Sequence, residues 1–425
     1  MESLRDKIPP FIEMEHQAAQ ILQIQEEHGW QFDEAAAWEL ASSLEEELRQ
    51  LSRVLQQRHP YVPTSTFTPS RNDSSRGYIK GCEFTRITSL NITSRDHIAW
   101  TLKEHYDWIP EKLSTKTQKP VIDEVVLASL SIPIAAEFAR ALTIKKTLGM
   151  MSHGVNAWLK LCTTSSRIHH HCSTATNTFR CAHRKPNLGQ VPSDPKYRKL
   201  FIASPGFVIT GADLSGIELR CLAHYLARYD DGSYAKTLLN DDIHQVNAEK
   251  IGITRKQVKT VTYAMLYGAS DGKIGKSFDP LLPKKQAVEK GKEIRAAYVE
   301  AIPGLDKLLA DIKKASARGY VKAIDGRRVL LDSPHKSLNF LLQSTAAVIA
   351  KSWMIIAHEN IKQLGIEAHQ LAFIHDELQF ETLPPNVRDL QTSLVYSAMH
   401  AGEYYNFRIP IAAEAKTGSS WAETH

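Results

Sequence analysis

The sequence contains no long apolar run. Hydrophobic residues make up 43% of the 425 residues, but polar residues interrupt them often enough that no segment is predicted to span a bilayer. The opening residues, MESLRDKIPPFIEMEH, lack the apolar core of a signal peptide. We therefore expect no membrane partner and a cytoplasmic location, which is the host cytoplasm if the protein is viral.

Cysteine is scarce and a strong charge excess is lacking. The cysteines are odd in number and include no CxxC spacing, which favours a reducing compartment: Cys82, Cys162, Cys172, Cys181 and Cys221. The net charge of +5 permits a polyanionic partner without requiring one. A chain of 425 residues is too long for one core and predicts two or three structural units.

Hydrophobic periodicity predicts many helices and fewer strands. A helix after Asp33 ends at the polar stretch RHPYVPTSTFTPSRNDSSRG, which predicts an exposed loop. Its apolar face comprises Leu44, Leu48, Leu51 and Leu55. Further helices are expected over about 121–161, over 217–318 and in LNFLLQSTAAVIAKSWMIIAHENI, with short strands and loops over 167–207.

The segment FVITGADLSGIELRCLAHYLA predicts a buried strand followed at once by a helix. Asp213 follows the strand Phe207–Ala212, where a rigid element would hold its carboxylate for metal or acid–base chemistry. A simpler interpretation stays open from this segment alone, in which Asp213 or Ser215 caps the helix.

A second predicted helix carries two cations and two phenols at intervals of four residues: Arg255, Lys259, Tyr263 and Tyr267. Because four residues advance about 400° around a helix, these side chains form one slowly winding stripe. Apolar residues form the opposite face, and Gly268 ends the helix. The stripe suits a nucleoside triphosphate, although an ordinary amphipathic helix with solvated Arg and Lys gives the same pattern.

The stretch LAFIHDELQFE places His375, Asp376 and Glu377 between two short apolar strands. Alone it is more typical of a solvated turn than of a site. If these strands neighbour the strand before Asp213, the two aspartates converge. Converged carboxylates repel unless divalent cations hold them, and Mg²⁺ suits both carboxylates and phosphate oxygens. Two such ions about 4 Å apart stabilise the attacking and leaving oxygens of a phosphoryl displacement.

Together these segments resemble the DNA polymerase I (family A) superfamily, in particular the replicative polymerases of T-odd coliphages and related podoviruses. The first family motif is similar to DLSGIELR, the second to the Arg-x3-Lys-x3-Tyr-x3-Tyr-Gly stripe, and the third to His-Asp-Glu. Further similarity follows the correct order in PNLGQVP, DIHQVNA, DGRRVLLDSPHKSLNFLLQS and SSWAETH. The resemblance covers nearly the whole chain.

The resemblance implies an α+β right-hand fold, with an antiparallel sheet in the palm and helical fingers and thumb. The implied divisions are a thumb with a helical entry at 1–165, the palm at 166–230 and 319–425, and the fingers at 231–318. The implied function is a template-directed DNA polymerase that adds dNTPs to a primer 3′-hydroxyl by two-metal phosphoryl transfer, in viral DNA replication. Primer–template DNA and dNTPs are the implied partners.

The resemblance also implies residue roles at the metals. Asp213, Asp376 and the backbone carbonyl of Leu214 would bind two Mg²⁺ ions, for which Mn²⁺ can substitute. Glu377 would support these ligands from behind. Lys259 would assist the leaving pyrophosphate.

Other implied roles concern the incoming nucleotide. Arg255 and Lys259 would bind its β- and γ-phosphates, with His244 nearby, and Tyr267 would lie near the templating base. Glu218 would fill the space that a ribose 2′-hydroxyl needs, which selects dNTPs by exclusion.

The remaining implied roles concern DNA and the sugar. Arg180, Asn339 and Gln343 would contact the minor groove, where correct base pairs share acceptors, and His375 would lie near the primer end. Tyr263 implies ready acceptance of dideoxynucleotides, because its phenol hydroxyl can replace the missing 3′-hydroxyl.

One segment departs from the family pattern. TNTFRCAH has Phe179 where the family has Gly, which puts in question the tight turn before Arg180. The surrounding HHHCSTATNTFRCAH is rich in potential metal ligands. Because successive strand residues point to opposite faces, His171 and Cys172 are not expected to reach one ion, and a structural zinc is disfavoured.

Two features of the coliphage relatives are not found. A short loop around Pro60–Arg76 replaces their long thumb insertion, which argues against thioredoxin as a partner. No 3′–5′ exonuclease domain precedes the helical entry, so we expect a separately encoded exonuclease or other replication proteins as partners, or a trimmed chain. Two alternatives stay open: a single-subunit RNA polymerase, against which Glu218 argues, and a catalytically silent DNA-binding accessory protein.

Overall fold

The computed structural model describes residues 8–280 and 282–425. The chain divides into two compact units. One comprises the residues up to Glu34 together with Leu161–His425, and the other comprises Ala35–Lys160. The predicted segment 1–165 is thereby divided, because its first helix groups with the C-terminal part of the chain.

The unit Ala35–Lys160 consists mainly of helices, as its sequence predicts. Phe138 and Leu102 lie fully buried in its core, and the predicted face of the first helix contributes Leu44 and Leu55. The helices are α2 (Glu34–Arg58), α3 (Arg95–Tyr106), α4 (Glu124–Ala128), α5 (Pro133–Leu148), a π-helical turn (Gly149–His153) and α6 (Trp158–Leu161).

The polar stretch after α2 is mostly exposed, as predicted, but only its later part is a loop. Its first part forms strand β2 (Tyr61–Phe67), which pairs antiparallel with β3 (Phe84–Ser89). The threonine, valine and aromatic residues of β2 favour a strand. Pro63 lies at a shift in the pairing register, which is where a strand tolerates a residue without an N–H.

The other unit is built on a four-stranded antiparallel sheet of order β10–β11–β7–β12. Its strands are β7 (Val208–Leu214), β10 (Ala368–Ile374), β11 (Glu377–Thr382) and β12 (Ala413–Gly418). The two central strands lie far apart in the sequence, so this sheet joins the two segments predicted to form the palm. The α+β class expected from the sequence is therefore confirmed.

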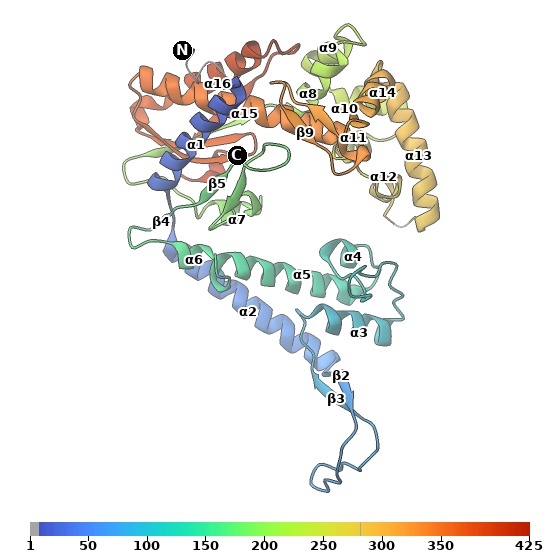
Figure 1. The fold of residues 1–425 in the computed structure, drawn as a ribbon. Helices are drawn as coiled ribbons and strands as arrows, with labels where there is room; N and C mark the ends of the chain where they lie inside the picture. Colours follow the sequence, from blue (N-terminus) through green and yellow to red (C-terminus); the bar gives the residue numbers. More distant parts are fainter. Residues whose placement is uncertain (1–7, 281) are drawn as a thin grey trace. The chain divides into compact units, whose positions relative to one another are not determined.

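Three helices pack with this sheet. They are α1 (Pro10–His28), α15 (Ser337–Gln363) and α16 (Val387–Tyr404); α1, drawn in blue in Figure 1, lies against α15 and β10. Among the described residues, Pro334–Gln363 is the one helical segment long and apolar enough to cross a membrane. Most of its apolar window is buried inside the protein, as expected for a core helix.

Of the remaining helices, α7 (Pro195–Arg198) precedes β7, and the others follow it and include the block predicted over 217–318. Figure 1 shows α10 to α14 grouped together. The elements are α7 (Pro195–Arg198), α8 (Ile217–Leu226), α9 (Ser233–Asn240), α10 (Ile243–Ile251), α11 (Arg255–Leu266), α12 (Asp271–Phe278), α13 (Lys284–Ala301) and α14 (Leu305–Ser316).

Three small antiparallel pairs complete this unit. The pair β5 (His171–Ser173) and β6 (Ala182–Arg184) forms a hairpin whose connection carries Arg180. The others are β1 (Trp30–Gln31) with β4 (Arg167–Ile168), and β8 (Tyr320–Lys322) with β9 (Arg328–Leu330).

Candidate active site

Strand pairing brings the predicted acidic residues together. β7 and β11 are neighbours, and their register pairs Asp213 with Glu377. The backbone N–H of Leu214 donates to the carbonyl of Asp376 at 3.0 Å. The predicted adjacency of the two strands is therefore confirmed. Asp213 lies within the last two residues of β7, where the ladder fixes its backbone.

The turn between β10 and β11 consists of His375 and Asp376, because Ile374 already pairs with Glu377. His375 has φ +60°, the left-handed conformation that two-residue hairpin turns require. His375 is exposed and Asp376 is half-buried. The turn thus presents Asp376 at the end of two buried strands, as the hairpin prediction requires.

Glu377 is buried and fully engaged by hydrogen bonds. Its carboxylate accepts from the Trp421 indole N–H and from the Gln379 amide at 2.6 Å, and the His425 ring nitrogen Nδ1 lies 3.1 Å from its other oxygen. Thr424 in turn donates to Gln379 at 2.8 Å. These bonds therefore hold the Glu377 side chain in one orientation, opposite Asp213 in the strand register.

Sequence reasoning assigned no role to His425 or Trp421. His425 Nδ1 lies 3.8 Å from Asp213, and the bond to Glu377 raises the pKa of this imidazole. The signal available was the match of SSWAETH to the family pattern, which marks the segment without indicating what it contacts.

The electrostatics of this cluster favour a bound cation. Burial, and then the negative charge of Glu377, raise the pKa of Asp213 to about 7. Burial and Glu218 raise that of Asp376 to about 6. Crowded carboxylates of this kind are relieved by a divalent cation, and oxygen donors are the ligands that Mg²⁺ prefers. The carboxylate oxygens of Asp213 and Asp376 therefore fit a hard divalent metal.

The predicted sugar gate lies in a small hydrogen-bonded group. One oxygen of Glu218, on the first turn of α8, accepts from Arg180 at 2.9 Å and from the Tyr267 hydroxyl at 3.1 Å. Three elements far apart in the sequence thus meet at one carboxylate. Each of these residues was predicted to be in the site, but their mutual bonding was not.

The α11 stripe is confirmed as a helix surface. Val258, Val261 and Met265 are buried on the opposite face, while Arg255 and Lys259 are exposed. The rings of Tyr263 and Tyr267 lie 6.5 Å apart in a stacked orientation. A Thr254–Gln257 capping box starts the helix, which fixes where the stripe begins.

The stripe is linked to the carboxylates and to α10. Burial, Glu218 and Asp376 raise the pKa of Tyr263, so this phenol is within electrostatic range of both carboxylates. The His244 ring lies 6.2 Å from that of Tyr263. Arg255 donates to Asp242 at 2.6 Å, at the start of α10, which holds its guanidinium beside the stripe.

The predicted DNA contacts have different surroundings. Asn339 is buried and its amide donates to the Leu266 carbonyl at the end of α11, at 3.0 Å. Gln343, one turn further along α15, is half-buried. In this structure Asn339 is therefore bonded to the end of α11, whereas the side chains of Arg180 and Gln343 are partly accessible to solvent.

The tight turn before Arg180 is retained without glycine. Phe179 has φ +63°, a left-handed conformation that costs a non-glycine residue about 1–2 kcal/mol. The Arg327 guanidinium lies 4.4 Å from the centre of the Phe179 ring. This cation–π contact opposes the backbone cost, since such pairs contribute about 0.5–2 kcal/mol.

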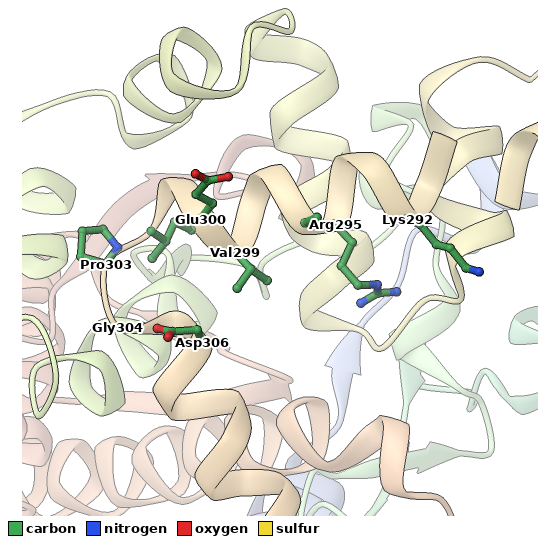
Figure 2. Close-up of a pocket in the computed structure, with 9 residues that line it drawn as sticks. Lys292, Arg295, Val299, Glu300, Pro303, Gly304 and Asp306 are labelled. Carbon is green, nitrogen blue, oxygen red and sulfur yellow. The ribbon is translucent and has the colours of Figure 1, made fainter. Parts of the chain in front are cut away.

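A surface pocket lies away from this cluster, between α13 and the start of α14 (Figure 2). It is lined by Lys292, Arg295, Glu300 and Asp306 among others, and by none of the predicted site residues. Arg295 bonds Asp271 at 2.6 Å and so ties α13 to α12. The pocket therefore belongs to the packing of these helices.

Comparison with known proteins gives the same family along the chain. The model of "DNA polymerase family A" matches residues 79–423. The DNA-directed DNA polymerases of Enterobacteria phage T3 and Escherichia phage T7 are each 30% identical over 499 aligned residues, which cover 97% of this chain and 70% of each relative.

A solved structure shares the fold. The "POL domain of Pol1 from M. smegmatis complex with DNA primer-template and dNTP" aligns with a TM-score of 0.78 over 96% of this chain and 70% of that chain. Its sequence identity of 20% supports the fold alone.

Proposed function

Because the chain belongs to DNA polymerase family A, and is a DNA-directed DNA polymerase, we propose that Asp213 and Asp376 form its metal site. The observation that carries this proposal is the β7–β11 register, which sets Asp213 opposite Glu377 and beside Asp376. The carbonyl of Leu214 would complete the site. Two Mg²⁺ ions, or Mn²⁺ in their place, would activate the primer 3′-hydroxyl and neutralise the triphosphate.

The other site residues would act on the nucleotide, on the DNA or on the metal ligands. Arg255 and Lys259 are exposed side chains on one face of a capped helix, which supports their binding of the β- and γ-phosphates. Lys259 would stabilise the leaving pyrophosphate. Glu377, held by three donors, would keep Asp213 in place without contacting the substrate.

Selection of the sugar and the base would depend on α8 and α11. Glu218 is held by Arg180, so its carboxylate would exclude a 2′-hydroxyl while Tyr263 faces the 3′ position. His244 would border the nucleotide.

Entry of a nucleotide and its template partner would break the Tyr267–Glu218 bond and free Tyr267 to pack beside the template. Arg180, Gln343 and Asn339 would contact the minor groove, and His375 the primer end.

The segments of the sequence, as distinct from the two compact units, also receive functional assignments in this proposal. We assign 1–165 to the thumb with its helical entry, 166–230 and 319–425 to the palm, and 231–318 to the fingers. Primer–template DNA and dNTPs are the proposed partners, and the cytoplasm of the host cell is the proposed location. The short β2–β3 hairpin supports action without thioredoxin.

Primer extension tests the proposal directly. We expect Mg²⁺-dependent extension with dNTPs and little with rNTPs. Asp213→Asn and Asp376→Asn should each lower the rate by at least about 10³-fold, because the loss of metal-held charge removes several kcal/mol of transition-state stabilisation. Binding of primer–template DNA should persist in both variants.

A matched control is Asp306→Asn, which changes an exposed aspartate on α14. It should extend primers at the wild-type rate. Extension that survives both Asp213→Asn and Asp376→Asn would show that the carboxylates do not carry the reaction.

A further inference from the structure

A second set of potential metal ligands lies on the β5–β6 hairpin, apart from the carboxylate site. His170, Cys172 and His183 each offer one ligand atom, and these atoms all lie within 4.8 Å of one another. Cys172 and His183 are paired residues in the antiparallel register, and His170 precedes Cys172 by two residues. Residues two apart on an extended chain face the same side. The alternation that separates His171 from Cys172 therefore brings His170 and Cys172 together.

All three side chains are buried, and each of the two histidines has one ring nitrogen without a hydrogen-bond partner among the described residues. His170 is 0% exposed, and Cys172 and His183 are each 8% exposed. Within the described part of the chain, His170 Nδ1 and His183 Nε2 have no hydrogen-bond partner. A buried polar atom without a partner costs about 1–3 kcal/mol. Cys172 Sγ lies 3.1 Å from His183 Nδ1, so the thiol directly contacts one of the two imidazoles.

The chemistry of these donors selects a class of metal. His170 and His183 each offer a ring nitrogen, and Cys172 offers its sulfur. Two nitrogens and one sulfur suit zinc and similar transition metals, whereas Mg²⁺ requires oxygen donors. The carboxylate of Glu26, on α1, is engaged with His171 instead.

Side chains next to the three ligands would hold these ligands in fixed orientations. The Gln25 amide lies 3.1 Å from His170 Nε2 and 3.6 Å from Cys172 Sγ, and its own oxygen accepts from Gln370 at 2.8 Å. Partners of this kind orient metal ligands in proteins. The set therefore has buried ligands and an ordered outer layer.

We propose that His170, Cys172 and His183 form a structural site for a zinc-class transition metal that ties the two arms of the β5–β6 hairpin together. Coordination releases the thiol proton of Cys172 to solvent and leaves the sulfur as a thiolate ligand. The hairpin ends in the strained turn at Phe179 and positions Arg180 on Glu218. The ion holds the base of this turn without contacting substrate.

Metal analysis of the full-length purified protein tests the site without a polymerase assay. Protein prepared without chelators should contain about one equivalent of zinc. Cys172→Ser should lose it, and the matched variant Cys162→Ser, which changes a half-buried cysteine outside the set, should retain it. Asp213→Asn should also retain it, which separates this ion from metal at the carboxylates.

Two further measurements keep the test decisive if Cys172→Ser folds poorly. Wild-type protein stripped of metal and given Co²⁺ should show a thiolate-to-cobalt charge-transfer band, which a carboxylate site cannot produce. A strong chelator should lower the melting temperature of the wild type and leave that of Cys172→Ser unchanged.

The proposal is overturned if the wild type contains no zinc and gains neither zinc nor the cobalt band on addition of the metals. The thiol–imidazole hydrogen bond between Cys172 and His183 is then the whole role of the pair. Zinc that persists in Cys172→Ser but disappears in Asp213→Asn overturns it as well.

Discussion

Single carboxylates in this protein are fixed by several donors, most of which come from distant segments. Glu377 is bonded by Gln379, Trp421 and His425, and Glu218 by Arg180 and Tyr267. A carboxylate with such partners keeps one orientation, which positioning of metals or sugars requires. The residue types at the site were predictable from the sequence. Their hydrogen-bond partners were not, because the type of a residue does not indicate which residues it contacts in the folded protein.

Tyr263 carries a prediction about the sugar of the nucleotide. The wild type should incorporate dideoxynucleotides nearly as well as dNTPs, because the phenol hydroxyl can take the place of the missing 3′-hydroxyl. Tyr263→Phe removes this hydroxyl alone and should restore discrimination by at least about 10²-fold, as loss of a positioned hydrogen bond typically does. Competition between ddNTPs and dNTPs in primer extension measures the ratio, and equal ratios would contradict the role.

Glu381 carries a prediction about acid stability. It is 1% exposed. Burial alone would raise its pKa, but hydrogen bonds from His28, Ser204 and Arg167 outweigh burial and lower the pKa to about 2. Because the folded-state pKa lies below the unfolded value, the carboxylate stabilises the fold above about pH 4.5, and this contribution is lost as the pH falls towards 2.

We therefore expect Glu381→Gln to lower the free energy of unfolding by about 2 kcal/mol at pH 7 and by much less at pH 3. Urea denaturation at the two pH values measures this difference. Glu367→Gln, at an exposed glutamate next to β10, serves as the control and should stay within about 0.5 kcal/mol of the wild type. A difference that does not shrink at pH 3 would contradict the linkage.

At the scale of elements, the residue pattern of α11 agrees with the helix that forms. In the β2–β3 and β5–β6 hairpins, some residue types do not favour the backbone conformation that the structure adopts. The four-residue spacing of the stripe, the buried opposite face and Gly268 at φ +68° all follow from helix periodicity. The β2–β3 hairpin was not predicted, because its Pro, Ser and Thr content is typical of loops as well as of edge strands. Pairing with β3 makes this segment a strand and not a loop.

The turn of the β5–β6 hairpin gives a prediction about backbone strain. Phe179→Ala removes the ring over Arg327 and keeps the left-handed strain, whereas Phe179→Gly removes both. We expect Phe179→Gly to be more stable than Phe179→Ala by about 1 kcal/mol, because glycine adopts a positive φ at little cost. Thermal unfolding of the two variants under the same conditions measures the difference. The reverse order would mean that the turn relaxes when the ring is absent.

At the scale of the whole molecule, the two units have separate cores. Phe138, 0% exposed, lies in the core of Ala35–Lys160, and Phe373, 2% exposed, lies in that of the other unit. Each core would therefore respond to its own mutations.

We expect Phe138→Ala to cost about 3–5 kcal/mol in its own unit, because it leaves a cavity in a packed core. Amide hydrogen exchange should then accelerate through residues 35–160 and leave the amides of β7 and β11 protected. Phe373→Ala, the reciprocal control, should give the opposite distribution. Acceleration of both units in either variant would show that they unfold together.

The sequence by itself determined whatever depends on neighbours along the chain. The strand and helix around Asp213, the α11 stripe and the His375–Asp376 turn follow from periodicities of a few residues, and the family motifs follow from their order. The α+β class could be predicted for the same reason.

Only the tertiary structure decided which of these elements meet. Asp213 and Glu377 are brought opposite each other by strand register, Glu218 meets Arg180 and Tyr267 from three elements, and His425 folds onto the carboxylates. Likewise, alternation along the extended chain places His170 and Cys172 on the same side. Only the register of the hairpin brings His183 close to both. Residues far apart in the sequence can be close in space once the chain folds, so their separation in sequence does not predict the distance between them. Contacts between segments are therefore fixed by packing and register, which exist only in the folded protein.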